Sequence, residues 1–407
     1  MKKKRYVLMW LFLLLPPFLQ GCGTAEGGIA VRELNQLNVV MTTGVDYDPK
    51  QKKFIVSIQS VKPAKEKKAG ITPEVIYTTR ATGDTIMEAT KKMRAQTSGK
   101  LIWFHSKIII LGKALTESKA LSEAVDFFAR NREIRFSSWV LIAKNTAEEI
   151  VNTKPVGEVT MGDELSGIIN NQPEWGGTVV VSLRDVLNAY VNPYEGFITG
   201  QVGKMKGKDG KDQVTITGGV VINSSNLNQN PSVTRLSKKE IRALRLIHKV
   251  GQQEAEMIYP VSLIKENDQK VKKFNTAVQV KIASRKQSAV IENGRPRIKL
   301  DLKLEATILE SGTREDLMQK ETIDQMERMI GGEMRRDMQA LLNKVQKRDK
   351  VDIFGFSSLI HRQHKHYWYQ SKGQWKEIYP TIPVDIHFQW SMLRNGIIVQ
   401  VKEGGKK

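Results

Sequence analysis

A single cysteine constrains this chain more than any other feature. Cys22 is the only cysteine among 407 residues, so no disulfide can form within the chain. The fold must therefore be stabilised without covalent cross-links, by a core large enough to offset the entropy lost on folding. With 40% hydrophobic and 26% charged residues, the composition is that of ordinary globular protein, and the length allows two or three domains.

The segment that ends at Cys22 has the layout of a lipoprotein signal peptide. Four cations precede an uncharged apolar stretch, which two prolines then end. The stretch is too short to span a membrane, which takes ~20 residues of helix. Leu19-Gln20-Gly21-Cys22 resembles a lipobox, the site where a diacylglyceryl group is attached to cysteine. A buried free cysteine beside an ordinary cleavage site is the alternative. We expect an exported chain with a signal peptide at 1–21 and a lipidated tether at 22–30.

The formal net charge of +21, or +17 without the four cations of the signal segment, indicates an anionic partner or a highly solvated surface. In a cytosolic protein such an excess would suggest nucleic acid, but export removes that partner. Two interpretations stay open: attraction to phospholipid headgroups, worth ~1 kcal/mol per cation near the surface, and cations spread for solubility. No later apolar run reaches spanning length, so we expect the rest of the chain to lie outside the membrane.

Alternating strand and helix patterns predict an α+β, multi-domain fold with mixed β-sheets flanked by helices. Residues 31–199 are expected to form an N-terminal α/β domain, since apolar runs such as 108–111 are typical of strands covered on both faces. Residues 200–211 contain four lysines and four glycines and are interpreted as a linker or exposed loop. They would open a small central domain at 200–270, followed by a C-terminal α+β domain at 271–407.

The C-terminal domain should contain a hairpin and a long helix. Strand candidates at 276–284 and 288–292 are followed by Asn293-Gly294, a strong hairpin signal. Apolar residues then recur every three or four positions over 320–347, which predicts a helix ~42 Å long. We expect the methionines of this repeat, Met326, Met334 and Met338, in the core, and Gly331-Gly332 to mark a kink or a close contact.

The sequence carries no recognisable enzyme motif. It has no G-x-S-x-G, P-loop, G-x-G-x-x-G or H-E-x-x-H pattern, and lipid would consume its only thiol. His361 and His364, with His366 nearby, lie one helical turn apart and could reach a zinc ion. Their neighbours are basic and aromatic, without a supporting carboxylate, so we expect a polar helix end instead. His105 is expected to be a hydrogen-bonded histidine at the start of a strand. We predict no enzyme activity, no metal and no cofactor.

Motifs spread along the chain point to a family. They are Arg32-Glu33-Leu34-Asn35-Gln36-Leu37, Thr43-Gly44-Val45-Asp46, Phe104-His105, Asp126-Phe127-Phe128, Glu133-Ile134-Arg135, Asp352-Ile353-Phe354-Gly355-Phe356, His361-Arg362 and the stretch from Trp375 through Pro380. In order and spacing, over about residues 22–400, they resemble the Ger(x)C family, the lipoprotein C subunits of spore germinant receptors. The family usually has Cys-Trp-Asp shortly before R-E-L, whereas this chain has no tryptophan at 23–31.

The resemblance implies a non-enzymatic receptor subunit on the outer face of the spore inner membrane. Its partners would be the membrane-embedded A and B subunits, with which it would sense small nutrients. The motif positions would then serve structure or partner contact: Arg32, Glu33, Leu34, Gly44, Asp46, His105, Asp126, Phe127, Asp352, Phe354, Gly355, His361 and Pro380. We further expect 352–356 to be a buried corner that positions the end of the long helix against the final sheet. A lipoprotein solute-binding subunit of a transporter is the alternative function, and a cell-surface hydrolase is a third.

Overall fold

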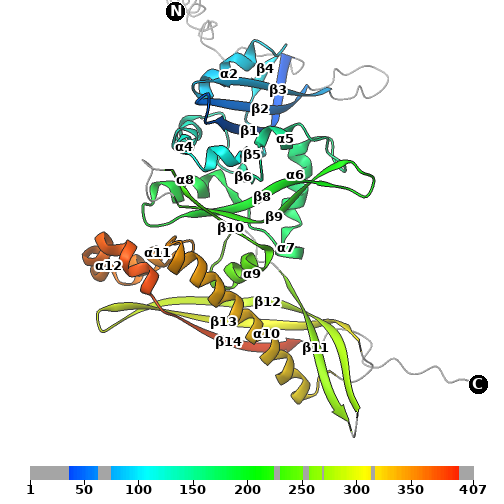
Figure 1. Ribbon diagram of the computed structural model, residues 1–407, viewed down its shortest axis with the longest axis vertical. Coiled ribbons are helices and arrows are strands. Elements are labelled where there is room, and N and C mark those ends of the chain that lie inside the picture. The colour runs from blue at the N-terminus through cyan, green and yellow to red at the C-terminus, as the bar shows by residue number, and fades with distance from the viewer. Residues whose placement is uncertain are drawn as a thin grey trace, which may run out of the picture.

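The molecule is elongated, and its chain builds two β-sheets one after the other along the long axis (Figure 1). The computed structural model describes residues 36–62, 75–223, 230–250, 256–267, 270–312 and 317–393. The expected α+β class, with mixed sheets flanked by helices, is confirmed. The signal segment, the tether with Cys22, and motif residues Arg32, Glu33 and Leu34 lie outside the described residues.

Within the described residues, the larger sheet has ten strands in the order β10-β9-β8-β6-β5-β1-β2-β3, with β4 paired to β1 and β7 to β6. Its strands are β1 (Leu37–Asp48), β2 (Lys53–Lys62), β3 (Val75–Gly83), β4 (Lys100–Ile102), β5 (Ile108–Leu111), β6 (Trp139–Ala143), β7 (Val181–Ser182), β8 (Phe197–Lys206), β9 (Asp212–Asn223) and β10 (Ser232–Leu236). The central pairs β1–β5, β5–β6 and β6–β8 are parallel, and the pairs nearer the two edges are antiparallel.

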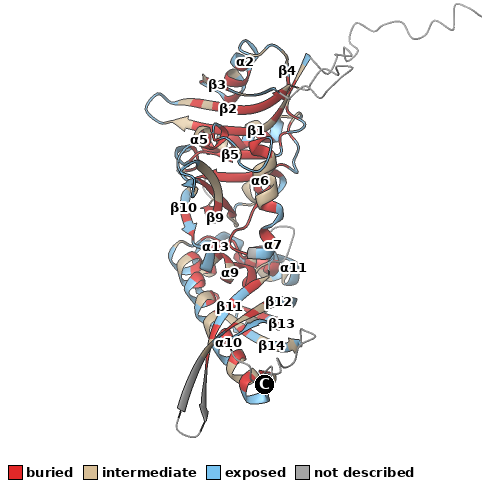
Figure 2. Ribbon diagram, turned by 90° about the vertical axis from the view of Figure 1, so that its right-hand side faces the viewer, coloured by how far each residue is buried: buried red, intermediate tan, exposed pale blue. Residues whose placement is uncertain are grey.

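Helices cover both faces of this sheet because its central strands are apolar on both faces. In β5, Ile109 and Leu111 belong to the core beneath α4 (Ala120–Arg130), while Ile108 and Ile110 belong to a second core beneath α5 (Ala147–Val151). Figure 2 shows the buried residues running along these strands. The same region contains α2 (Ile86–Arg94), α3 (Lys113–Thr116), α6 (Met161–Asn170), α7 (Gln172–Trp175), α8 (Leu183–Val191) and α9 (Lys238–Ile247).

The smaller sheet has the strand order β11-β12-β13-β14 within the described residues. Its strands are β11 (Met257–Asn267), β12 (Lys270–Glu292), β13 (Arg295–Ser311) and β14 (Val384–Leu393). The expected hairpin between β12 and β13 is confirmed, because Asn293 (φ 50°) and Gly294 (φ 74°) form the turn with positive φ angles. The final strand β14 returns to pair with β13 in parallel.

The long helix packs across this sheet, as Figure 1 shows. It consists of α10 (Lys320–Leu341) followed by a π-helical stretch (Leu342–Arg348). The methionines of the apolar repeat, Met326, Met334 and Met338, are fully buried, so their assignment to the core is confirmed, whereas Met329 of the same helix is 40% exposed. A Cβ atom at Gly331 would lie 3.5 Å from the rings of Phe388 and Trp390, so this glycine marks close packing of α10 on β14. The chain then forms α11 (Phe356–Gln363), α12 (Lys365–Ser371) and α13 (Trp375–Ile378) before β14.

The interpretation of residues 200–211 as a linker is wrong, because they form part of the β8–β9 hairpin. The alternative of an exposed loop holds only for its turn, residues 207–211. Lys204 and Lys206 extend from β8 to the carboxylate of Asp212 on β9, so the lysines lie on the surface of a paired ribbon. The segment 200–270, expected to be a small domain, contributes β9 and β10 to the larger sheet and β11 to the smaller one. The two strand candidates at 276–284 and 288–292 are one strand, β12, which has two register shifts in its pairing with β13.

Candidate functional site

The motif residues of β1 fasten this strand to helix α5. The carboxylate of Asp46 accepts hydrogen bonds from the backbone N–H groups of Ala147 (2.8 Å) and Glu148 (2.9 Å), which begin the helix. These N–H groups lack partners within the helix and favour a negative charge. Burial raises the pKa of Asp46, although the two N–H groups oppose the shift. A Cβ atom at Gly44 would lie 3.0 Å from Ala147 Cβ, so glycine lets the helix approach. Both motif residues have structural roles.

The role expected for His105 is wrong. His105 is exposed in the turn before β5, and its neighbour Ser106 makes the buried hydrogen bonds there. Ser106 Oγ lies 3.0 Å from Thr43 Oγ1, and the Ser106 carbonyl accepts a hydrogen bond from Ser138 Oγ at 2.6 Å. The buried position before β5 is therefore occupied by Ser106, and His105 lies on the surface.

Asp126 and Phe127 lie on α4 at a surface groove of about 860 Å³. Phe127 is half-buried and packs edge-on against Phe128, with 5.3 Å between ring centroids. Asp126 pairs with Arg130 at 2.8 Å, but both side chains are exposed, so this ion pair contributes little to stability. The motif pair therefore borders an accessible groove rather than lying in the core.

The corner at 352–356 is built around one buried carboxylate. Asp352 accepts hydrogen bonds from the backbone N–H groups of Phe354 (3.2 Å), Phe356 (3.1 Å) and Ser357 (2.8 Å). Phe354 and Phe356 are fully buried, as expected, and their rings stack with centroids 5.3 Å apart. Gly355 between them has φ 69°, a left-handed conformation that side chains other than glycine rarely adopt. The carboxylate thus fixes the turn that begins α11.

This corner joins the two sheets, a role that the sequence did not reveal. The Asp352 carbonyl accepts a hydrogen bond from Gly196 N–H at 3.1 Å, immediately before β8 of the larger sheet. Glu195 Oε1 accepts hydrogen bonds from the hydroxyls of Ser357 (2.8 Å) and Ser358. The expected corner therefore exists at the end of the long helix, but its polar contacts fasten it to the unit that contains the larger sheet.

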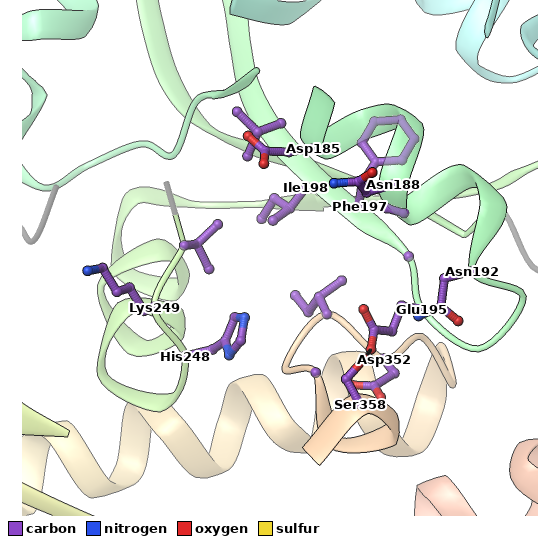
Figure 3. Close-up of a pocket in the computed structure, with 16 residues that line it drawn as sticks. Asp185, Asn188, Asn192, Glu195, Phe197, Ile198, His248, Lys249, Asp352 and Ser358 are labelled. Atoms are coloured by element: carbon purple, nitrogen blue, oxygen red, sulfur yellow. Dashed lines mark hydrogen bonds between the residues drawn. The ribbon is translucent and has the colours of Figure 1, made fainter. Parts of the chain in front are cut away.

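A cavity of about 420 Å³ lies at this junction. Figure 3 shows Asp352 and Ser358 below it, Asp185, Asn188 and Phe197 above it, and His248 at one side. Burial, and then the charge of Glu195, raise the pKa of Asp352 to about 7, against the effect of the backbone N–H groups. Both carboxylates accept hydrogen bonds from the protein itself: Asp352 from backbone N–H groups, and Glu195 from the two serine hydroxyls. A Cβ atom at Gly355 would lie 3.2 Å from His248 Cε1, so the corner and the segment after α9 touch.

Aromatic rings extend the joint along the C-terminal helices. Trp368 on α12 packs edge-on against Tyr194 of the larger-sheet unit at 4.9 Å between centroids, and His361 on α11 stacks on Trp368 at 5.8 Å. The Tyr379 hydroxyl donates a hydrogen bond to the carbonyl of Val351 at 2.8 Å. Pro380, the next residue, is half-buried in a short 3-10 turn. His361 thus covers Trp368 from the solvent side, since its own side chain is exposed, and Pro380 lies next to the tyrosine that is hydrogen-bonded to Val351.

The three clustered histidines have different surroundings. His364 Nε2 lies 2.8 Å from the carbonyl oxygen of Ala289 on β12, whereas His366 lies beside Gln370. Across the described ranges no group of three or more His, Cys, Asp or Glu side chains is placed to hold a metal ion. None of the helices in these ranges is long and apolar enough to cross a membrane. The expectation of a metal-free helix end stays a prediction.

The sequence did not point to Tyr194, Glu195 or His248. A local signal existed for the first two, because Asn192-Pro193 and Gly196 favour a turn. In the structure the Asn192 side chain accepts a hydrogen bond from Tyr194 N–H at 3.1 Å. Nothing in that signal identifies a partner more than 150 residues away, so the joint becomes visible only in the folded chain.

Comparisons with known proteins cover nearly the whole chain. The family model described as the spore germination protein N-terminal domain matches residues 30–203, and the model described as spore germination B3/GerAC like, C-terminal, matches residues 227–396. Glu195 falls in the first match and Asp352 in the second.

Curated relatives agree with these matches. Spore germination protein KC of Bacillus subtilis (strain 168) is 22% identical over 412 residues, covering 97% of this chain and 97% of its own length. Spore germination protein B3 of the same organism is 23% identical over 371 residues, covering 90% and 94%. A crystal structure of the GerBC protein matches with a TM-score of 0.54 and 17% identity, over 86% of this chain and 96% of that chain. At that identity the likeness concerns the fold.

Proposed function

Because the chain belongs to the Ger(x)C family of spore germination proteins, we propose that it is the C subunit of a germinant receptor, anchored by lipid on Cys22. The observation that carries the proposal is the extent of the match: two family regions in sequence order, and relatives covered over nearly their full length. The lipobox-like sequence at 19–22 supplies the anchor. The proposed place is the outer face of the spore inner membrane, beside membrane-embedded A and B subunits.

The proposed role is mechanical and not enzymatic. The conspicuous buried acids, Asp46 and Asp352, each accept hydrogen bonds from backbone N–H groups at the start of a helix. Carboxylates held in this way fix the starts of the two helices, which supports a structural role for both. The joint between the two sheets would keep the subunit rigid enough to pass a change at one end to partners at the other. The two sheets also differ in strand number and order, unlike the paired lobes expected of a solute-binding protein.

The anchor can be tested on Cys22 directly. In spores that carry Cys22→Ala, modification and lipoprotein-type cleavage should fail, so no fatty-acid label should be incorporated and nutrient-triggered germination should weaken. Two acyl chains hold a protein stably on a membrane where one does not, since each buried methylene contributes ~0.8 kcal/mol. The measurement is metabolic labelling with a fatty acid, followed by fractionation at high salt.

A matched variant controls for changes in the signal segment itself. Gln20→Ala brings the segment closer to a common lipobox and should leave labelling and membrane retention intact. A labelled, salt-resistant membrane band from the Cys22→Ala protein would refute the anchor.

A further inference from the structure

The start of the described chain lies at one extreme of the molecule. Figure 1 shows β1–β4 and α2 at one end of the long axis and the smaller sheet towards the other. At that end Leu37, which opens β1, pairs with Lys100 of β4, and Lys62 of β2 pairs with Val75 of β3. The ends of four strands therefore gather where the chain emerges from the tether.

This end is strongly basic. Helix α2 turns its apolar side to the sheet, which leaves Lys91 and Arg94 of its last turn exposed, and Lys100 is exposed at the start of β4. We call Lys91, Arg94 and Lys100 the cationic end. The segments that build it contain no Asp or Glu: 36–41, 58–62, 75–79 and 91–102. Val75 and Ile76 of β3 add exposed apolar surface there.

The anchor restricts how far this end can lie from a membrane. Gln36 follows Cys22 by fourteen positions. A fully extended chain of that length spans at most ~50 Å. Lipid on Cys22 would thus bring the cationic end to the surface before the smaller sheet. Each cation close to an anionic lipid surface raises the binding constant about fivefold. The effect reaches about one Debye length, which is ~8 Å at physiological salt.

We propose that the cationic end docks on anionic phospholipid headgroups, so that the anchored chain stands on this end and presents the smaller sheet away from the membrane. The inference rests on the proposed lipid anchor but goes beyond it, because an anchor alone fixes no orientation. Docking assigns the surplus charge at this end to a lipid surface and places the larger sheet nearer the membrane than the smaller sheet.

The absence of any cysteine besides Cys22 makes the test clean, because an introduced cysteine is the one free thiol of the lipidated chain. A donor dye is placed on the exposed Gln96→Cys beside the cationic end, or on the exposed Gln389→Cys of β14 in the smaller sheet. Energy transfer to an acceptor on lipid headgroups is measured for the lipidated protein in two kinds of vesicle: with phosphatidylglycerol, and with phosphatidylcholine alone.

We expect high transfer from position 96 and low transfer from position 389 in anionic vesicles, and loss of the difference in molar salt. Losing three cations should weaken docking about a hundredfold, and replacing them by glutamates should weaken it further and lower the transfer from position 96. The test variant combines Lys91→Glu, Arg94→Glu and Lys100→Glu. The matched control reverses three exposed cations of the smaller-sheet unit, Lys286→Glu, Lys303→Glu and Lys376→Glu, and should change nothing. Melting curves verify that both variants fold.

Equal transfer in the two kinds of vesicle, or unchanged transfer in the test variant, would overturn the docking proposal. Failure of the anchor gives a different result. A chain without lipid would not float with phosphatidylcholine vesicles, whereas an anchored chain that does not dock floats with them and shows no preference between the two labelled positions.

Discussion

The corner that joins the two sheets should be sensitive to the loss of a single ring. Phe354 is fully buried, and its ring stacks on Phe356 with 5.3 Å between centroids. Removing a buried phenylalanine side chain costs ~3–5 kcal/mol, because the lost burial is joined by the cavity left behind. With a urea dependence of about 3 kcal/mol per molar, suited to a chain of this size, Phe354→Ala should lower the midpoint of unfolding by about 1–1.7 M.

The assay is urea unfolding followed by tryptophan fluorescence, because Trp368 and Trp375 pack near the corner with ring centroids 5.2 Å apart. Phe104→Ala is the control, since Phe104 is 47% exposed and its truncation should cost about 0.5 kcal/mol or less. A midpoint for Phe354→Ala within about 0.2 M of the unsubstituted chain, together with a loss of germination, would contradict this reasoning. Phe354 would then be reassigned to a partner surface.

Stability should also depend on pH through Asp352. Its pKa is about 7 in the folded chain and ~3.9 when unfolded, so the folded chain binds the extra proton between these values. Stability should therefore fall as pH rises from 4 to 7, by up to about 4 kcal/mol, and Asp352→Asn should flatten this slope in urea midpoints. Gly355→Ala should destabilise by at least ~1 kcal/mol in the same assay, because φ is 69° and a Cβ atom would meet His248 at 3.2 Å. Gly373→Ala, with no atom within 4 Å, should cost nothing. Zinc titration of the purified chain should show no stoichiometric binding below micromolar concentrations, and a one-to-one complex abolished by His364→Ala would contradict that expectation.

Local patterns predicted the parts of the fold that local physics decides. Four consecutive apolar residues in β5 require cover on both faces, and both cores are present. Asn293-Gly294 tolerates positive φ angles, which a tight hairpin needs. The methionine stripe of α10 follows the helical repeat and is buried against the smaller sheet. In each case the deciding residues are neighbours along the chain.

The failures share a different cause. Residues 200–211 have the composition of a linker, but pairing with β9 makes 200–206 part of a strand and 207–211 its turn, and pairing partners are not visible in composition. The same holds for the joint, where Ser357 and Glu195 are 162 residues apart. Before β5, Ser106 makes the buried hydrogen bonds and His105 is exposed, because Ser106 lies against Thr43 and Ser138 of other strands or loops. Long-range contacts decide the structure at these positions, and local patterns in one sequence do not reveal such contacts.

The central claim is that this chain is the C subunit of a germinant receptor, and it is tested most directly by identifying the proteins that bind the chain in the membrane. The lipidated protein would be captured from solubilised spore membranes, and the proteins retained with it identified by mass spectrometry. We expect a multi-spanning A subunit and a transporter-like B subunit to be recovered together, and both to be depleted when the captured protein carries Cys22→Ala, because the unanchored chain loses its high effective concentration beside them. Recovery of a transport ATPase and its permease instead, or of neither receptor subunit, would contradict the assignment.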